Sequence, residues 1–156
     1  MKARVPYEER SDLEKIQSQW TKLTGSLHNN EQWSAAIVRA ATAAEIAANF
    51  AIRREFEANS QFESAFINSL LRWANGLSGK IDRLLLPLNQ NSKNGKKINR
   101  LKSVAEKINR ERNAIIHQGQ FRNSSDAKEI IKLSKKFIET IVQIYEPSFS
   151  LKEKSS

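Results

Sequence analysis

The chain has 156 residues, a length typical of one domain with a substantial hydrophobic core. It contains no cysteine, which excludes disulfides, thiolate metal sites and cysteine nucleophiles. Its formal net charge of +9 indicates polyanionic partners, nucleic acid before membrane, although many soluble proteins are basic for no binding reason.

Helical periodicity dominates along the chain, and few residues favour strands. A first helix is predicted from about Tyr7 to Leu23, ended by Gly25. A second helix, capped by Asn29 or Asn30, is predicted to reach about Glu57. The apolar faces are predicted to consist of Leu13, Ile16, Trp20 and Leu23 in the first helix and Trp33, Ile37, Ala40, Ala44 and Ala51 in the second.

Neither a secretory signal nor a membrane span is expected. The N-terminal stretch MKARVPYEERSD has no apolar core. The longest apolar-rich stretch is mostly alanine and is interrupted by Arg39 and Glu45, so it is a poor membrane span.

The middle of the chain is predicted to hold a third helix, a short helix and a loop. Asn59 and Ser60 indicate a break and a new cap. The third helix then carries Phe62, Phe66, Leu70 and Trp73. A short helix is predicted over Ile81 to Leu86, and Pro87 with the following Asn/Ser/Gly cluster ends it in a loop.

Two long helices are predicted in the C-terminal part. The fourth helix runs from about Lys96 to Gln118. The fifth is capped by Ser124 or Ser125, has Asp126 in its first turn and reaches about Tyr145. Pro147 stops it, so residues 147–156 are predicted to be a disordered tail. The chain is therefore expected to be a single all-α domain over residues 1–146, an up-and-down bundle of four or five helices.

The fourth predicted helix has a charged residue at a position that its pattern marks as buried. Its apolar residues are Ile98, Leu101, Ala105, Ile108 and Ile115. Arg112 occupies the missing place in that series. Because a guanidinium is almost never fully buried alone, this position requires a carboxylate, a bound anion or a wet cleft. His117 lies in the last turn before Gly119, about 140° around the helix from Arg112 and on the side of Asn113.

The segment RNAIIH, Arg112 to His117, resembles the R–N–x–x–x–H signature of HEPN domains, small helical bundles found in many microbial toxins and defence proteins. As in that family, the motif lies late in a long helix and is followed by a glycine and a further helix. Glu45, in AATAAEIAANF, is by pattern the counterpart of an acidic residue on an earlier family helix. Some toxin branches carry a tyrosine two residues past the histidine, where this chain has Gly119, so modification chemistry at such a tyrosine is not carried over.

The resemblance implies a metal-independent endoribonuclease that needs no cofactor and acts as a homodimer on RNA. Its catalytic residues would be Arg112, Asn113 and His117, with Glu45 in support. Attack of a 2′-hydroxyl on the adjacent phosphate needs a base, an acid and positive charge near the phosphorane oxygens. Histidine, which titrates near neutral pH, suits the proton transfers, and arginine offers a fork of donors to phosphate. A toxin or defence role, an antitoxin or defence-system partner protein and a cytoplasmic location away from membranes are further expectations.

A basic stretch precedes the motif on the same predicted helix. The predicted RNA-binding residues are Lys96, Lys97, Arg100, Lys107 and Arg110. A polyanion along this face would be delivered to Arg112 and His117, with binding that weakens steeply with salt. A solvated lysine-rich helix face is the plain alternative. No aromatic residues are interleaved, so a dedicated platform for single strands is not expected.

Other interpretations of the same residues remain open. A non-catalytic HEPN-like module that binds nucleotide or RNA, or docks to a partner, would carry the same motif. A purely structural dimer would use Arg112 to close a buried ion pair with Glu45. His117 is also compatible with a surface residue that complements the helix end, and Asn113 with a space-filling role. Glu45 fits a solvated helix face equally well, and His28 is predicted to be a surface loop residue.

Overall fold

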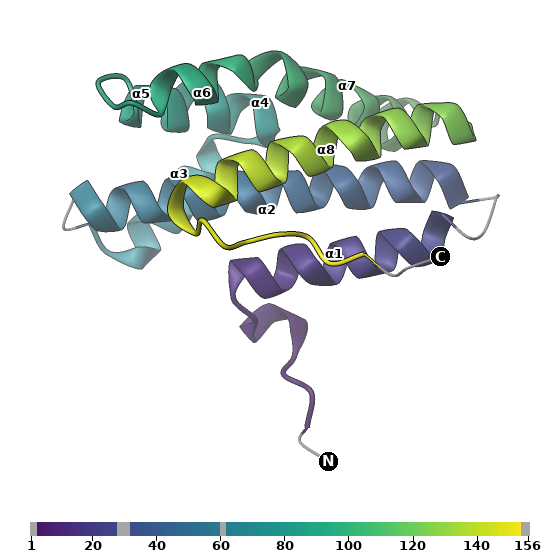
Figure 1. The fold of residues 1–156 in the computed structure, drawn as a ribbon, viewed down its shortest axis with the longest axis horizontal. Coiled ribbons are helices and arrows are strands. Elements are labelled where there is room, and N and C mark those ends of the chain that lie inside the picture. Colours follow the sequence, from purple (N-terminus) through teal and green to yellow (C-terminus); the bar gives the residue numbers. More distant parts are fainter. Residues whose placement is uncertain (1–2, 28–31, 60–61, 154–156) are drawn as a thin grey trace.

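In the described part of the chain, four long helices run up and down around a shared core (Figure 1). The structure, a computed structural model, describes residues 3–27, 32–59 and 62–153. The long helices are α1 (Asp12–Leu27), α2 (Trp33–Asn59), α7 (Lys102–Gln118) and α8 (Ser124–Tyr145). No strand occurs among these residues, and the predicted all-α helical bundle is confirmed.

The central helix of the bundle is α2, which contacts α1, α7 and α8. It is rich in alanine, the residue with the highest helix propensity, whose small side chain lets neighbouring helices approach closely. Four of the residues predicted for its buried face are fully buried, namely Ile37, Ala40, Ala44 and Ala51. By length and composition Trp33–Ala58 could cross a membrane, but 61 % of its most apolar window is buried in the bundle. Core packing therefore accounts for this apolar composition.

Short elements connect the long helices. They are a 3₁₀ turn η1 (Tyr7–Glu9), α3 (Ser64–Trp73), α4 (Gly76–Lys80), a π-helical segment (Ile81–Leu85), α5 (Leu86–Leu88) and α6 (Gly95–Arg100). The predicted start of the first helix at Tyr7 is wrong because Ser11 Oγ accepts the backbone N–H of Glu14 at 3.2 Å, which caps α1 where it begins. Its predicted end at Gly25 is wrong too, since α1 continues to Leu27. The predicted caps Asn29, Asn30 and Ser60, and His28, lie outside the described residues.

The predicted fourth helix is divided in two at Leu101, between α6 and α7. The N–H of Leu101 donates to the carbonyl of Ile98 at 3.0 Å, three residues back rather than four. Such a bond, three residues back, tightens the chain locally. Leu101 itself is buried, as its place in the apolar series predicts.

Two further predictions about helices are corrected. The cap of α8 is Asn123, not Ser124 or Ser125: Asn123 and Asp126 exchange backbone-to-side-chain hydrogen bonds in a capping box. The third predicted helix is α3, which begins at Ser64, so Phe62 lies before it. Phe62, Phe66 and Trp73 are exposed, while Ile67 and Leu71 are buried. The aliphatic side chains fit the core, and the larger rings remain outside it.

The chain after Pro147 packs against α1, as the yellow segment in Figure 1 shows. Leu151 is buried in the main core. Gln17 of α1 donates from Nε2 to the carbonyl of Lys152 at 3.0 Å and accepts the N–H of Lys152 at 2.9 Å. The predicted disordered tail is therefore wrong for residues 147–153, because one buried leucine and a paired backbone fix this segment.

Glu153 makes the packing of this segment dependent on pH. A hydrogen bond from Lys135, aided by one from Trp20, lowers the pKa of Glu153 below its ordinary 4.5, although burial opposes the shift. Because the pKa of Glu153 is lower in the folded chain than in the unfolded chain, the ionised carboxylate stabilises the fold at pH values above its ordinary pKa. This stabilisation is lost as the pH falls through the pKa of the folded chain. We expect Glu153→Gln to lower the urea midpoint near pH 7 and to leave it unchanged near pH 2. An equal difference at both values would contradict this assignment.

Candidate functional site

The segment RNAIIH forms the end of α7, and the loop after it is tied to the bundle. Gly119 ends the helix in the left-handed conformation, with φ of +64°, as expected for a glycine at this place. Arg122 in the following loop pairs with Glu111 of α7, Nε to Oε2, at 2.6 Å, and this hydrogen bond raises the pKa of Arg122. The N–H of Arg122 donates to Oγ of Ser34 at 2.9 Å. The end of α7 is therefore held against the start of α2.

Arg112 lies in the packed face of α7, as its spacing predicts. Leu101, Ala105 and Ile108, which precede it in the series, are buried. Arg112 is partly exposed, but its Nε is buried and has no hydrogen-bond partner among the described residues. An unsatisfied buried donor costs roughly 1–3 kcal/mol. The buried part of the Arg112 side chain therefore lies where a hydrocarbon would avoid an unsatisfied donor.

Glu45 is paired with a residue that the sequence did not single out. Lys80 of α4 donates from Nζ to Oε1 of Glu45 at 2.6 Å, and Lys80 is only 5 % exposed. No ion pair joins Arg112 to Glu45 in the described chain, so the predicted alternative of such a pair is wrong. A signal in the sequence could have identified Lys80. It lies three residues after Leu77 and four before Leu84, both of which are buried, so helical spacing places it on an apolar face, as it does Arg112.

The Glu45–Lys80 pair has a clear consequence for stability. Removing the carboxylate leaves an ammonium buried without its counter-charge, and breaking a buried pair in this way typically costs about 3–5 kcal/mol. We expect Glu45→Gln to lower the free energy of unfolding by about 3 kcal/mol in urea titrations. The double variant Glu45→Gln/Lys80→Met should recover most of that loss, because neither charge then remains. A double variant as unstable as the single one would contradict this account.

Asn113 lines a polar cavity of about 500 Å³ between α4 and α7. The other lining residues are Ser78, Glu106, Asn109, Arg110 and Gln118. Arg112 and His117 are not among them. His117 is exposed in the last turn of α7, about 40° around the helix from Asn113 and about 140° from Arg112. Asn113 and His117 therefore share one side of α7, whereas Arg112 lies on the packed side.

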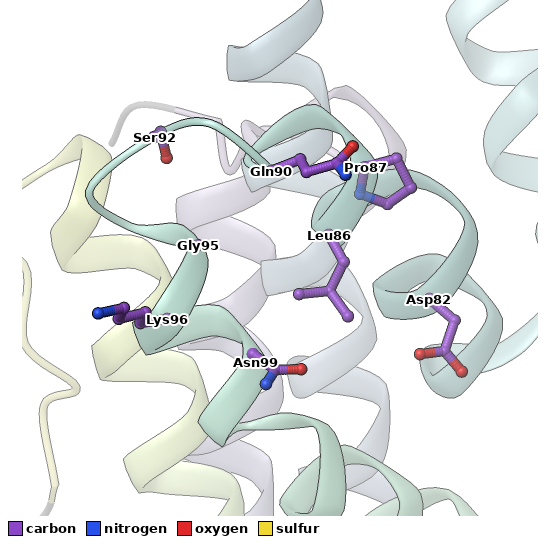
Figure 2. A pocket seen from close by; sticks show the side chains of 8 residues that line it. All are labelled: Asp82, Leu86, Pro87, Gln90, Ser92, Gly95, Lys96 and Asn99. Carbon is purple, nitrogen blue, oxygen red and sulfur yellow. The ribbon is translucent and has the colours of Figure 1, made fainter.

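The predicted RNA-binding residues lie on two successive helices, α6 and α7. Lys96, Lys97 and Arg100 are exposed on α6. Lys96 also lines a cavity of about 560 Å³ next to α5, and Figure 2 shows its side chain directed away from Leu86 on the wall of that cavity. These three cations form a solvent-facing basic group on α6, the helix that precedes α7.

The second basic group belongs to α7 and consists of Lys107 and Arg110. Lys107 forms a solvent-exposed ion pair with Glu129 of α8. Arg110 is exposed and lines the same cavity as Asn113. The RNA-binding role of Lys107 and Arg110 stays a prediction, and Arg110 is the cation nearest in sequence to Asn113 on that side.

Comparison of the chain with protein-family models, with curated proteins and with solved structures found no match. Within the described residues, no group of three or more His, Asp or Glu side chains is placed to hold a metal ion. The chemistry available at the end of α7 consists of an exposed imidazole, an amide in a polar cavity and a half-buried guanidinium.

Proposed function

We propose that this protein is an HEPN-type endoribonuclease that cleaves RNA without a metal ion or cofactor. The observation that carries the proposal is Arg112, whose buried Nε lacks a partner although packing favours a hydrocarbon there. A costly cation five residues before an exposed His117 is consistent with selection for binding an anion rather than for stability.

The proposed reaction is a transesterification at a phosphate of the RNA backbone. The 2′-oxygen attacks the adjacent phosphorus and loses its proton to a base, while the bond to the 5′-oxygen breaks and that oxygen gains a proton from an acid. The products are a 2′,3′-cyclic phosphate and a free 5′-hydroxyl. His117 serves as base or acid, Asn113 orients the imidazole or a phosphate oxygen, and Arg112 stabilises the phosphorane charge.

One chain supplies one motif histidine, whereas the reaction needs two proton transfers. A homodimer with two motifs across one cleft supplies both groups. Two exposed apolar side chains lie next to His117 in the chain: Ile116 is 49 % exposed and Phe121 is 91 % exposed. Large apolar side chains beside a polar site are suited to contact with a second copy.

We expect the double variant Ile116→Ser/Phe121→Ser to shift the protein from dimer to monomer and to reduce RNA cleavage in parallel. The physical reason is the loss of apolar area from the contact between copies. Sedimentation velocity and a cleavage assay on the same preparations measure the two effects. A matched control is Phe66→Ser, an exposed aromatic on α3, which should change neither. A wild-type protein that is monomeric at micromolar concentration and still cleaves RNA would exclude the dimer mechanism.

The proposed substrate is RNA in the cytoplasm. It would bind through the exposed cations of α6 and Arg110, and the net charge of +9 of the chain favours such a polyanion. A toxin or defence role, with an antitoxin or another defence protein as partner, follows from the resemblance of RNAIIH to the HEPN signature.

The test is incubation of wild-type protein with mixed RNA in the presence of a metal chelator. Cleavage with 2′,3′-cyclic phosphate ends supports the proposal. Salt-dependent binding without cleavage would instead identify a binding module, and neither binding nor cleavage would identify a structural dimer.

A further inference from the structure

A second polar cavity lies between α2, α3 and α4, apart from the residues that line the Asn113 cavity. Its volume is about 530 Å³, within the range of roughly 300–1,000 Å³ typical of small-molecule sites. The polar lining consists of three cations, three amides and one carboxylate, namely Arg53, Arg72, Lys80, Asn49, Asn68, Asn75 and Glu45. Such a lining is suited to a ligand that is both anionic and rich in hydrogen-bonding groups.

The most buried of these cations is Lys80, whose side chain is 6 % exposed. An ammonium group has three N–H donors. Within the described chain, Lys80 donates one hydrogen bond, to Glu45. Its two other donors make no bond to the described chain, so an oxygen-rich ligand that enters the cavity can accept them.

The cavity also has an excess of positive charge. Arg53 is neutralised by Asp12 at 2.6 Å, as Lys80 is by Glu45. Arg72 has no carboxylate partner among the described residues, and its one hydrogen bond goes to Ser69 Oγ at 3.4 Å. Its guanidinium is therefore available at the cavity, and the planar fork of donors matches a phosphate.

The remaining lining residues define the rest of the ligand. Leu71 is the one apolar residue in the described lining, and no aromatic ring lines the cavity there. A stacked base is therefore not favoured. Asn49, Asn68 and Asn75 contribute amide groups. Oδ1 of Asn49 is buried without a partner, whereas Oδ1 of Asn68 accepts a hydrogen bond from Nη2 of Arg53 at 3.2 Å. Hydroxyl groups, which both donate and accept, complement such a lining.

We propose that this cavity binds a phosphorylated sugar, with the phosphate at Arg72 and Lys80 and the sugar hydroxyls at the asparagine amides. Neither Arg112 nor His117 lines this cavity, although Glu45, which the HEPN resemblance names as a supporting residue, does. Binding of the sugar phosphate does not depend on the proposed nuclease activity. The same chemistry is present in a free sugar phosphate and in the ribose phosphate of a nucleotide, so both are compared in the test.

The experiment is calorimetric titration of the full chain with ribose 5-phosphate, adenosine 5′-monophosphate, ribose and inorganic phosphate. We expect ribose 5-phosphate to bind at least about tenfold more tightly than ribose or phosphate, because it engages both parts of the lining. Arg72→Gln should weaken that binding about tenfold, as loss of a charge-assisted hydrogen bond predicts. If adenosine monophosphate binds as tightly as ribose 5-phosphate, the ligand is the ribose phosphate of a nucleotide. If adenosine monophosphate binds more weakly than ribose 5-phosphate, the ligand is a free sugar phosphate.

A matched control is Arg83→Gln, an exposed arginine stacked on Trp73 that does not line the cavity. It should leave the affinity unchanged, and so should His117→Ala. Equal binding of phosphate or ribose alone would overturn the proposal, as would no binding at millimolar ribose 5-phosphate. None of these outcomes depends on RNA cleavage, so the two proposals fail independently.

Discussion

Replacing His117 with alanine is expected to reduce RNA cleavage by about 10²–10⁴-fold, the usual contribution of a positioned acid or base. The variant should fold normally, because His117 is exposed at the end of α7 and makes no hydrogen bond within the described residues. The measurement is the initial rate of formation of 2′,3′-cyclic phosphate ends in the presence of chelator, with circular dichroism and sedimentation as checks on fold and dimer.

The sequence offers a matched control for this variant, since His28 is its other histidine. His28→Ala should cleave RNA at the wild-type rate. Retention of cleavage by a pure preparation of His117→Ala would remove His117 from the mechanism. Equal loss in both variants would indicate a general effect of removing imidazoles, and the proposed site would again be excluded.

Arg112→Leu is expected to make the protein more stable and less active at the same time. The leucine completes the apolar series on α7 and removes a buried donor without a partner, so the free energy of unfolding should rise by about 1 kcal/mol. Cleavage should fall by about 10²–10³-fold, because a charge that stabilises the transition state is lost. Urea titration and cleavage rates measure the two effects.

Arg39 of α2 provides the control for Arg112. Its Nε is also buried without a partner in the described chain, but it lies outside the RNAIIH segment. Arg39→Leu should therefore raise stability by a similar amount and leave cleavage unchanged. If Arg112→Leu destabilises the fold and retains cleavage, the guanidinium has a structural role, and the nuclease proposal loses its main support.

Much of the helical architecture was predictable because local patterns control it. Apolar residues at helical spacing predicted the buried faces of α1, α2 and α7, and Gly119 predicted the end of α7. The same reasoning identified Arg112 as a cation in a packed face, which the structure bears out. Periodicity works in these segments because each long helix has one face against the core.

Other features depended on contacts between distant parts of the chain. The aromatic face of α3 has helical periodicity, yet the core accepts Ile67 and Leu71 of the same helix instead. Leu151 follows a helix-breaking proline and is still buried in the core. Its segment is held because Gln17 of α1 forms a hydrogen bond with the backbone of Lys152. Periodicity shows that a face is apolar, but not whether a partner surface exists.

The sequence alone determined that the chain is all-helical, that it lacks cysteine chemistry and that Arg112 interrupts an apolar series. Only the tertiary structure decided that Glu45 pairs with Lys80 and that Arg72 joins them at one cavity, since these residues come from three helices. Helical spacing specifies directions around one helix axis. Which side chains meet across two axes depends on how the helices pack, and packing is a property of the whole chain.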